Sequence, residues 1–393
     1  MRPFRAFVLA WATCAAIAAC SDSSGPSAPD GPTGIPDPPK QTLALGAAHV
    51  CQIVGGTTAC WGSGDLGQLG NGGGSATDAR VTVTGGHAFT SIIAGSTHTC
   101  ALDDAGDAWC WGSNAQGQLG TGTLADEHCG AFACQTEPAR VASDEHFKQL
   151  TAGRDFTCGL TTAGAVRCWG ANDARQLGTN TVSDTCEALP CSHTPVVAAS
   201  GKTFVALSSA LNYPCALDQQ GVVSCWGLNP NSHHFTDTPE VIDASLAFGR
   251  IAGGGLHACA LDLDGAASCW GIDALGAGSA TLESARPVAV TGGHTFQAIA
   301  SGRYSSCGVD EDGAAWCWGD NTDGATGNEP VTSGTRFDDP VRVLGNFQFR
   351  TISAGATTYC GITTSGATAC WGRGTEGQLL NGGTGSTEPV VVD

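Results

Sequence analysis

The tripeptide Cys-Trp-Gly occurs seven times in this chain of 393 residues, and its cysteine always lies nine or ten positions after another cysteine. These leading cysteines are spaced 44 to 58 residues apart. Seven copies at such a period indicate a propeller or a similar array, in which each unit packs on its neighbours. The leading cysteines are Cys51, Cys100, Cys158, Cys215, Cys259, Cys307 and Cys360.

Each copy has the local pattern of an antiparallel hairpin. Between the two cysteines of the second copy, turn-forming residues run from Asp103 to Gly106, and short alternating apolar runs flank them. The cysteines are symmetric about the turn, so a hairpin places them opposite each other and within reach of a disulfide. The tryptophan after the second cysteine then points to the other face of its strand, where the next unit packs.

Two further strands are expected in each unit, a Val-x-Val run such as 81–83 and a Phe-x-x-Ile run such as 89–92. Four short antiparallel strands make one propeller blade, so residues 41–393 are predicted to form a single all-β, seven-bladed propeller. The first copy lacks a preceding Val-x-Val run, and the last copy ends on a spare one at 389–393. We therefore expect the C-terminal strand to join the first blade and close the ring.

The N-terminus indicates export. Residues 1–19 combine a basic start with an apolar run too short to span a bilayer, as in a signal peptide. The run ends Ile17-Ala-Ala-Cys20, which resembles the lipobox of bacterial lipoproteins, whose cysteine is lipidated. Residues 20–40 read as a disordered Ser/Pro/Gly tether. We expect a protein of the cell envelope, at the outer membrane or cell surface, that touches membrane only through its lipid. The alternative is an ordinary cleaved signal peptide.

The cysteines of the propeller form an even set. The seven hairpins use fourteen, and four more lie in two loops, 129–134 and 186–191, each with Cys-x4-Cys spacing. In an exported chain this predicts nine local disulfides. A four-cysteine zinc site across the two loops, near His128 and His193, is the alternative. The expected disulfide cysteines are Cys51, Cys60, Cys100, Cys110, Cys129, Cys134, Cys158, Cys168, Cys186, Cys191, Cys215, Cys225, Cys259, Cys269, Cys307, Cys317, Cys360 and Cys370.

The repeat as a whole reads Ala-Gly-x-x-His-Thr, then a Leu-x-x-x-Gly turn, then Trp-Gly-x-Asn-x-x-Gly-Gln-Leu-Gly, with the last four residues at 67–70 and 117–120. This pattern resembles the regulator of chromosome condensation repeat, a family of seven-bladed propellers. The likeness fades in the fourth copy, at 228–238, and in the fifth, at 272–278. In that family one loop face engages a small GTPase. We do not expect the exchange activity here, because the chain has an export signal and no segment that matches the exchange wedge.

The loops between each Ala-Gly and the first hairpin cysteine are expected to surround the channel on one face. Several carry tyrosine and arginine, which dominate binding hot spots. We expect a protein-binding propeller that contacts an unidentified protein through this face. The alternatives are an inhibitor of a secreted hydrolase such as a β-lactamase, a glycan- or envelope-binding structural lipoprotein, and side chains that only cap blade ends. The candidate partner-binding residues are Arg154, Asp155, Phe156, Asn212, Tyr213, Arg303, Tyr304 and Tyr359.

The sequence argues against other classes of function. A formal net charge of −19 disfavours nucleic acid, because phosphate binding needs clustered lysine and arginine. There is no nucleophile elbow and no His-Glu-x-x-His, so no catalytic residue, enzyme activity, cofactor or metal is expected. His49, His98 and His257 recur two residues before a leading cysteine, but other copies place other residues there, so we interpret them as local packing. A monomer is expected.

Overall fold

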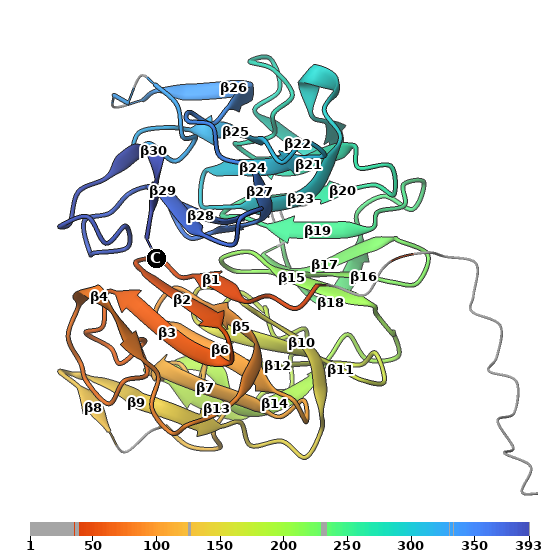
Figure 1. Cartoon of the computed structure of the whole chain (residues 1–393). Coiled ribbons are helices and arrows are strands. Elements are labelled where there is room, and N and C mark those ends of the chain that lie inside the picture. The colour runs from red at the N-terminus through yellow and green to blue at the C-terminus, as the bar shows by residue number, and fades with distance from the viewer. Residues whose placement is uncertain are drawn as a thin grey trace, which may run out of the picture. The chain divides into compact units, whose positions relative to one another are not determined.

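The computed structural model describes residues 35, 39–124, 127–228, 234–329, 331–332 and 334–392. In this part the regular secondary structure is β-strand, apart from one 3-10 turn, η1 (Thr291–Gly293). The strands form seven antiparallel sheets, the blades of a propeller (Figure 1). The expected signal peptide and lipidated Cys20 lie outside the described residues, as does most of the tether. Within the described residues, no helix has the length and apolar character needed to cross a membrane.

The first strand of each blade faces the central channel. These strands start at a phenylalanine in four of the seven blades, and in two more a phenylalanine lies two residues before the strand, which matches the expected Phe-x-x-Ile run. They alternate side chains between the two faces of the sheet, so each buries one set against a neighbouring blade. The innermost strands are β1 (Leu43–Leu45), β5 (Phe89–Ala94), β10 (Phe147–Ala152), β15 (Ala206–Ser209), β19 (Arg250–Gly253), β23 (Phe296–Ser301) and β27 (Phe349–Ala354).

The cysteine hairpin forms the middle of each blade, as predicted. Each pair of hairpin cysteines occupies directly opposite positions, as Cys51 and Cys60 do with a Cα–Cα distance of 4.1 Å. The first hairpin strands are β2 (His49–Val54), β6 (His98–Asp103), β11 (Phe156–Thr161), β16 (Pro214–Leu217), β20 (His257–Leu261), β24 (Ser305–Asp310) and β28 (Thr358–Thr363). The second are β3 (Thr57–Gly62), β7 (Ala108–Ser113), β12 (Val166–Ala171), β17 (Val223–Leu228), β21 (Ala267–Ile272), β25 (Ala315–Asp320) and β29 (Thr368–Gly372).

The fourth strand of each blade lies outside the hairpin, and the Val-x-Val runs at 81–83, 288–290 and 341–343 begin within such strands. These strands are β4 (Thr77–Thr82), β9 (Phe132–Arg140), β14 (Leu189–Ala198), β18 (Phe235–Val241), β22 (Glu283–Ala289), β26 (Arg336–Arg342) and β30 (Ser386–Val391). Two blades gain a fifth short strand, β8 (His128–Cys129) or β13 (Asp184–Cys186), from the Cys-x4-Cys loops. The described residues contain nine disulfides, in the pairing that the sequence predicted.

The prediction that the C-terminal strand joins the first blade is wrong. Strand β30 pairs with β29 in the last blade, and the first blade has four strands of its own. The sequence argument placed each Val-x-Val run in the blade that follows it. In the structure Val81 lies opposite Cys60 and Val341 opposite Cys317, so each run belongs to the blade that precedes it. The Cys-x4-Cys loops belong to the preceding blades for the same reason.

The ring therefore closes through packing between the first and last blades. The Trp61 indole donates a hydrogen bond to the carbonyl of Gln378 (2.8 Å), and the Arg80 Nε donates one to the carbonyl of Val392 (3.0 Å). Around them Leu43 and Leu45 pack against the Cys360–Cys370 hairpin. Figure 1 shows the C-terminal end beside the first blade. Closure rests on these side-chain contacts, because no strand is exchanged between the two blades.

The tryptophans of the seven Cys-Trp-Gly motifs are fully buried between blades, as predicted. The Trp111 indole donates to the carbonyl of Gln68 (3.0 Å), in the Gly-Gln-Leu-Gly turn of the preceding blade. Gly70, which ends that turn, has φ +66°, and a Cβ there would lie 2.7 Å from the Trp111 ring nitrogen. The turn glycine and the tryptophan of the next blade are thus one structural unit. This explains why they recur together along the sequence.

Candidate functional site

Two cavities follow one another along the channel and share Gly253, Ser301 and Ala354. The larger, of about 500 Å³, is lined by residues that precede or form the innermost strands. The smaller, of about 100 Å³, lies where these strands end. We call the lining of the smaller cavity the glycine mouth, and it comprises Leu45–Ala47, Ala94–Ser96, Ala152–Gly153, Ser209–Leu211, Gly253–Gly254, Ser301–Arg303 and Ala354–Ala356.

The glycine mouth is the face on which the partner-binding loops were predicted. Its backbone is fixed by hydrogen bonds that run from blade to blade. The amide of Ser96 donates to the carbonyl of Arg154 (3.3 Å), the amide of Arg154 to Leu211 (2.8 Å), and the amide of Leu211 to Gly254 (3.1 Å). Similar bonds join Ala47 to Ser96 and Arg303 to Ala356, so the loops of blades 1 to 5 and of blades 6 and 7 hold one another in place.

Three buried histidines connect neighbouring blades just behind this mouth. The His98 Nε2 lies 2.9 Å from the Thr157 hydroxyl of the next blade, which itself donates to the carbonyl of Gln118. The hydroxyl proton is used on the carbonyl, so the His98 Nε2 carries a hydrogen and donates it to the Thr157 oxygen. His49 and His257 make the equivalent contacts, to Thr99 at 2.9 Å and to Ser306 at 2.8 Å. The interpretation of these histidines as packed residues agrees with this geometry.

Burial shifts the acid–base behaviour of these histidines. Removal from water lowers the pKa of His98 to about 3, with a smaller contribution from His49, and lowers the pKa of His257 to about 3, with a smaller contribution from Arg336. Burial alone lowers the pKa of His49 to about 4. All three are therefore uncharged at neutral pH, and they act as hydrogen-bond donors between blades.

Three of the predicted partner-binding side chains are buried and cannot contact a partner. Phe156 and Tyr213 occupy the histidine position of their own blades, and each is at most 1% exposed. Tyr359 occupies the position of Thr157, and fills the space left by the small Ser305 of the preceding blade. The Tyr359 hydroxyl donates to the carbonyl of Ser305 (2.7 Å) and accepts from the amide of Gly302 (3.0 Å). For these residues the reading as blade-capping side chains fits the structure.

The other five predicted residues reach the surface of the glycine mouth to different degrees. Arg154 is exposed, and its Nε donates to the carboxylate of the half-buried Asp155 (2.7 Å). Asn212 is half-buried in the blade 4 loop. Arg303 is exposed, and its guanidinium lies 5.0 Å from the centre of the half-buried Tyr304 ring. The arginine–tyrosine pair is the predicted element that remains available to a partner.

The sequence reasoning missed Leu256, which is 37% exposed beside this pair. It follows Gly255, where a Cβ would lie 2.1 Å from the carbonyl oxygen of Arg303, so the two loops are in backbone contact. An exposed leucine next to an arginine and a tyrosine has the composition of an interface hot spot. The signal in the sequence was weak, since Leu256 lies in a blade whose repeat is degenerate and a single leucine is not informative.

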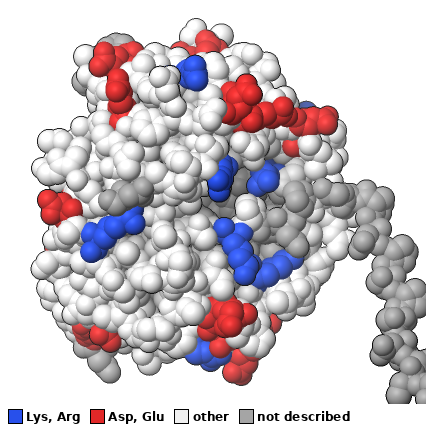
Figure 2. Space-filling model, viewed as in Figure 1, with Lys and Arg blue, Asp and Glu red and all other residues white. Residues whose placement is uncertain are grey.

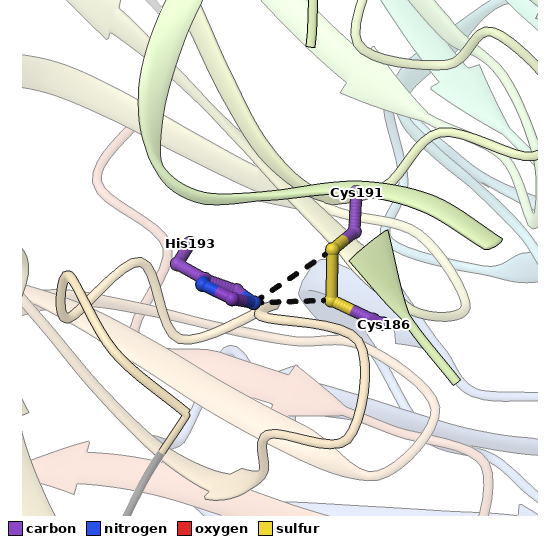
Figure 3. Close-up of side chains that lie close together, drawn as sticks. All are labelled: Cys186, Cys191 and His193. Atoms are coloured by element: carbon purple, nitrogen blue, oxygen red, sulfur yellow. Dashed lines mark hydrogen bonds between the residues drawn. A yellow bond between two sulfur atoms is a disulfide. The ribbon is translucent and has the colours of Figure 1, made fainter. Parts of the chain in front are cut away.

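The two Cys-x4-Cys loops hold disulfides, Cys129–Cys134 and Cys186–Cys191, as expected. In the second loop the His193 Nε2 lies 3.2 Å from the Cys186 sulfur and 3.7 Å from the Cys191 sulfur (Figure 3). Oxidised sulfurs offer no thiolate, so this cluster is not a site for zinc while the disulfide is intact. In the first loop Thr136 takes the place of His193.

The comparisons with known proteins agree with the geometry. The profile of the RCC1-like domain matches residues 32–393. The ultraviolet-B receptor UVR8 of Arabidopsis thaliana is 25% identical over 198 residues, which are 48% of this chain and 42% of the receptor. Two solved structures share the fold. Human WBSCR16 aligns with a TM-score of 0.73 and 18% identity over 86% of this chain and 94% of that one.

The second structure is yeast RCC1 (Prp20) bound to Kap60, with a TM-score of 0.72 and 19% identity over 90% of this chain and 85% of that one. At such identities the structures show a common fold and no more. The aligned part of UVR8 spans less than half of the receptor's length. The match to the domain profile, in contrast, covers the whole described ring. The chain therefore belongs to the RCC1-like domain family.

Proposed function

We propose that this chain is an exported, lipid-anchored propeller that binds a protein partner at the glycine mouth and has no catalytic activity. The observation that carries the proposal is the exposed Arg303–Tyr304 pair beside Leu256, held on a backbone that blade-to-blade hydrogen bonds fix in place. A rigid platform lowers the entropy lost on association, so a small patch of hot-spot residues is enough for specific binding.

Protein binding is also consistent with the family, since the yeast RCC1 structure contains a bound protein, Kap60. Export is supported by the nine disulfides, which form and persist in oxidising compartments. The lipid anchor rests on the sequence Ile17-Ala-Ala-Cys20. The partner is expected to be another envelope or extracellular protein.

The binding surface is tested with charge and shape changes on exposed side chains. The double variant Arg303→Glu/Tyr304→Ala and the matched control Arg350→Glu, at the other end of the channel, are used as bait for envelope extracts, with quantitative mass spectrometry. A true partner is enriched by the wild-type protein and by the control, and is bound at least about tenfold more weakly by the double variant, a difference of about 1.4 kcal/mol.

Two results would overturn the proposal. One is that no protein distinguishes the double variant from the control, and the other is that isolated glycans retain the protein without any protein partner. If the captured partner is a hydrolase, an activity assay decides whether binding inhibits it. The anchor is tested separately by the intact mass of the native protein, which is expected to show acylated Cys20 and nine disulfides. An unprocessed N-terminus or free thiols would contradict export.

A further inference from the structure

The end of the channel opposite the glycine mouth is positively charged, although acidic residues outnumber basic ones by 36 to 17 in the chain. Lys40, Arg250 and Arg350 line the cavity of about 500 Å³, and none of the described lining residues is acidic. Figure 2 shows lysine and arginine side chains gathered around a central hollow, with acidic side chains further out. We call this lining, Lys40, Arg250 and Arg350, the basic mouth.

The register of the innermost strands adds a fourth cation. Arg350 lies between Phe349 and Thr351, where β27 departs from regular pairing with β28. Lys148 has the same position in β10, between Phe147 and Gln149, and its side chain is exposed. Gln297, which lines the cavity, has this position in β23. Gln297 and Arg350 thus line the cavity from the sixth and seventh blades, and Lys148 adjoins the lining residue Gln149 in the third blade.

These cations have little to neutralise them. Among the described residues, Lys40, Lys148 and Arg250 have no side-chain hydrogen bond or ion pair, and Arg350 donates only to the carbonyl of Thr364. Other arginines form the ion pairs with acidic side chains. Arg167, for example, pairs with Glu145. Like charges around a cavity with low-dielectric walls focus the potential, so an anion is attracted and is held once it enters.

We propose that the basic mouth binds a small, multiply charged oxyanion, a di- or triphosphate or a di- or tricarboxylate. The cavity volume is in the range of small-molecule sites. Arginine suits such ligands, because its planar guanidinium can form two parallel hydrogen bonds to a carboxylate or phosphate.

The surroundings favour a small ligand over a long polyanion. The hairpin turn glycines Gly106, Gly265 and Gly313 lie against the first residues of the next innermost strands, so the aspartates of these turns lie at this end of the molecule. An extended polyanion would be repelled by these carboxylates, whereas a compact anion fits within the cavity that they surround. The inference is independent of partner binding, because it concerns the opposite end of the channel.

The test is isothermal titration calorimetry on the full chain, with pyrophosphate and with citrate at constant ionic strength. We expect saturable binding of at least one of the two anions, and the one that saturates shows whether the ligand is a phosphate or a carboxylate. The variant Arg250→Gln/Arg350→Gln is expected to bind it at least about tenfold more weakly, since two charge-assisted contacts are lost. Arg342→Gln, exposed at the end of β26 and outside both mouths, is the matched control and is expected to bind as the wild type does.

Because Arg250 is half-buried, the single variants Arg350→Gln and Lys148→Gln, at exposed positions, keep the test valid if the double variant misfolds. Each is expected to weaken binding by a smaller factor. The proposal is overturned if neither anion saturates the wild-type protein. It is also overturned if folded basic-mouth variants bind as tightly as the Arg342→Gln control, or if long-chain polyphosphate binds more tightly than pyrophosphate per site.

Discussion

The two ends of the channel are built from the same repeated strands, yet they differ in what their residues do. At the glycine mouth the repeat positions touch the next blade, so their side chains are buried and act in packing, as His98 and Tyr359 do. At the basic mouth the residue type at an equivalent position changes from blade to blade. Lys148, Gln297 and Arg350, for example, occupy the same position in three innermost strands. The comparison teaches that the repeated residues maintain the ring, whereas the unrepeated ones are free to serve function.

The sharpest test of this contrast is to truncate a buried side chain at the glycine mouth. Tyr359→Ala leaves a cavity between the sixth and seventh blades and removes the three hydrogen bonds of the tyrosine hydroxyl. We expect a loss of about 3–5 kcal/mol in the free energy of unfolding, measured by urea denaturation. Arg350→Gln, at the basic mouth, is expected to leave the urea midpoint unchanged. Equal midpoints for the two variants would remove the distinction between the ends.

The buried histidines make the glycine mouth sensitive to acid. The pKa of His98 is lowered from 6.5 to about 3 in the folded protein, so below pH 6.5 the unfolded chain takes up a proton that the folded chain does not. Stability therefore falls as pH decreases from 6.5 towards 3, and is fully retained above 6.5. For His98 the loss is about 2 kcal/mol between pH 6.5 and pH 5.

The measurement is urea unfolding of the wild type and of His98→Gln at both pH values. Glutamine can still donate to Thr157 but does not titrate. The difference in unfolding free energy between the two proteins should therefore narrow by about 2 kcal/mol from pH 6.5 to pH 5. His294→Gln, at a half-buried position outside the glycine mouth, serves as the control. A gap that does not depend on pH would show that His98 is not held neutral by burial.

Two buried tyrosines behind the glycine mouth are expected to differ in their contribution to stability, by a smaller amount. The Tyr359 hydroxyl has three hydrogen-bond partners, whereas the Tyr213 hydroxyl is buried and has none among the described residues. Tyr359→Phe should therefore lose about 1–3 kcal/mol of unfolding free energy, because three hydrogen bonds are removed and the buried Ser305 hydroxyl loses its partner, while the Gly302 amide and the Ser305 carbonyl keep the bond between them. Tyr213→Phe removes an unsatisfied group and should be neutral or slightly stabilising. A loss of stability in Tyr213→Phe would mean that its hydroxyl has a partner, such as a bound water.

Much of the fold could be predicted because its information is local. The hairpin disulfides follow from pairs of cysteines nine or ten residues apart, and a short turn brings them opposite each other. The burial of the tryptophans follows from strand alternation. The blade to which a Val-x-Val run belongs was predicted wrongly, because a strand that lies between two repeats can join either one. The sequence pattern does not distinguish these choices, but the pairing of Val390 with Cys370 does.

The candidate sites were predictable only in part. The glycine mouth was identified from the position of its loops, and Arg303 and Tyr304 do lie at its surface. The burial of Tyr359 was missed, because it depends on a small serine 54 residues earlier, across a blade interface. The basic mouth was missed entirely, since its residues lie in different blades and none of them belongs to a motif.

The sequence by itself determined the number of blades, the pairing of the cysteines and the identity of the buried tryptophans. These features are short-range, since each is set within a hairpin or by a repeated neighbour. Only the tertiary structure decided how the ring closes, which aromatic side chains are buried, and that Lys40, Arg250 and Arg350 meet at one cavity. Lys40 and Arg350 are 310 positions apart along the chain. Their proximity is set by the rotation from blade to blade, which no local pattern in the sequence encodes.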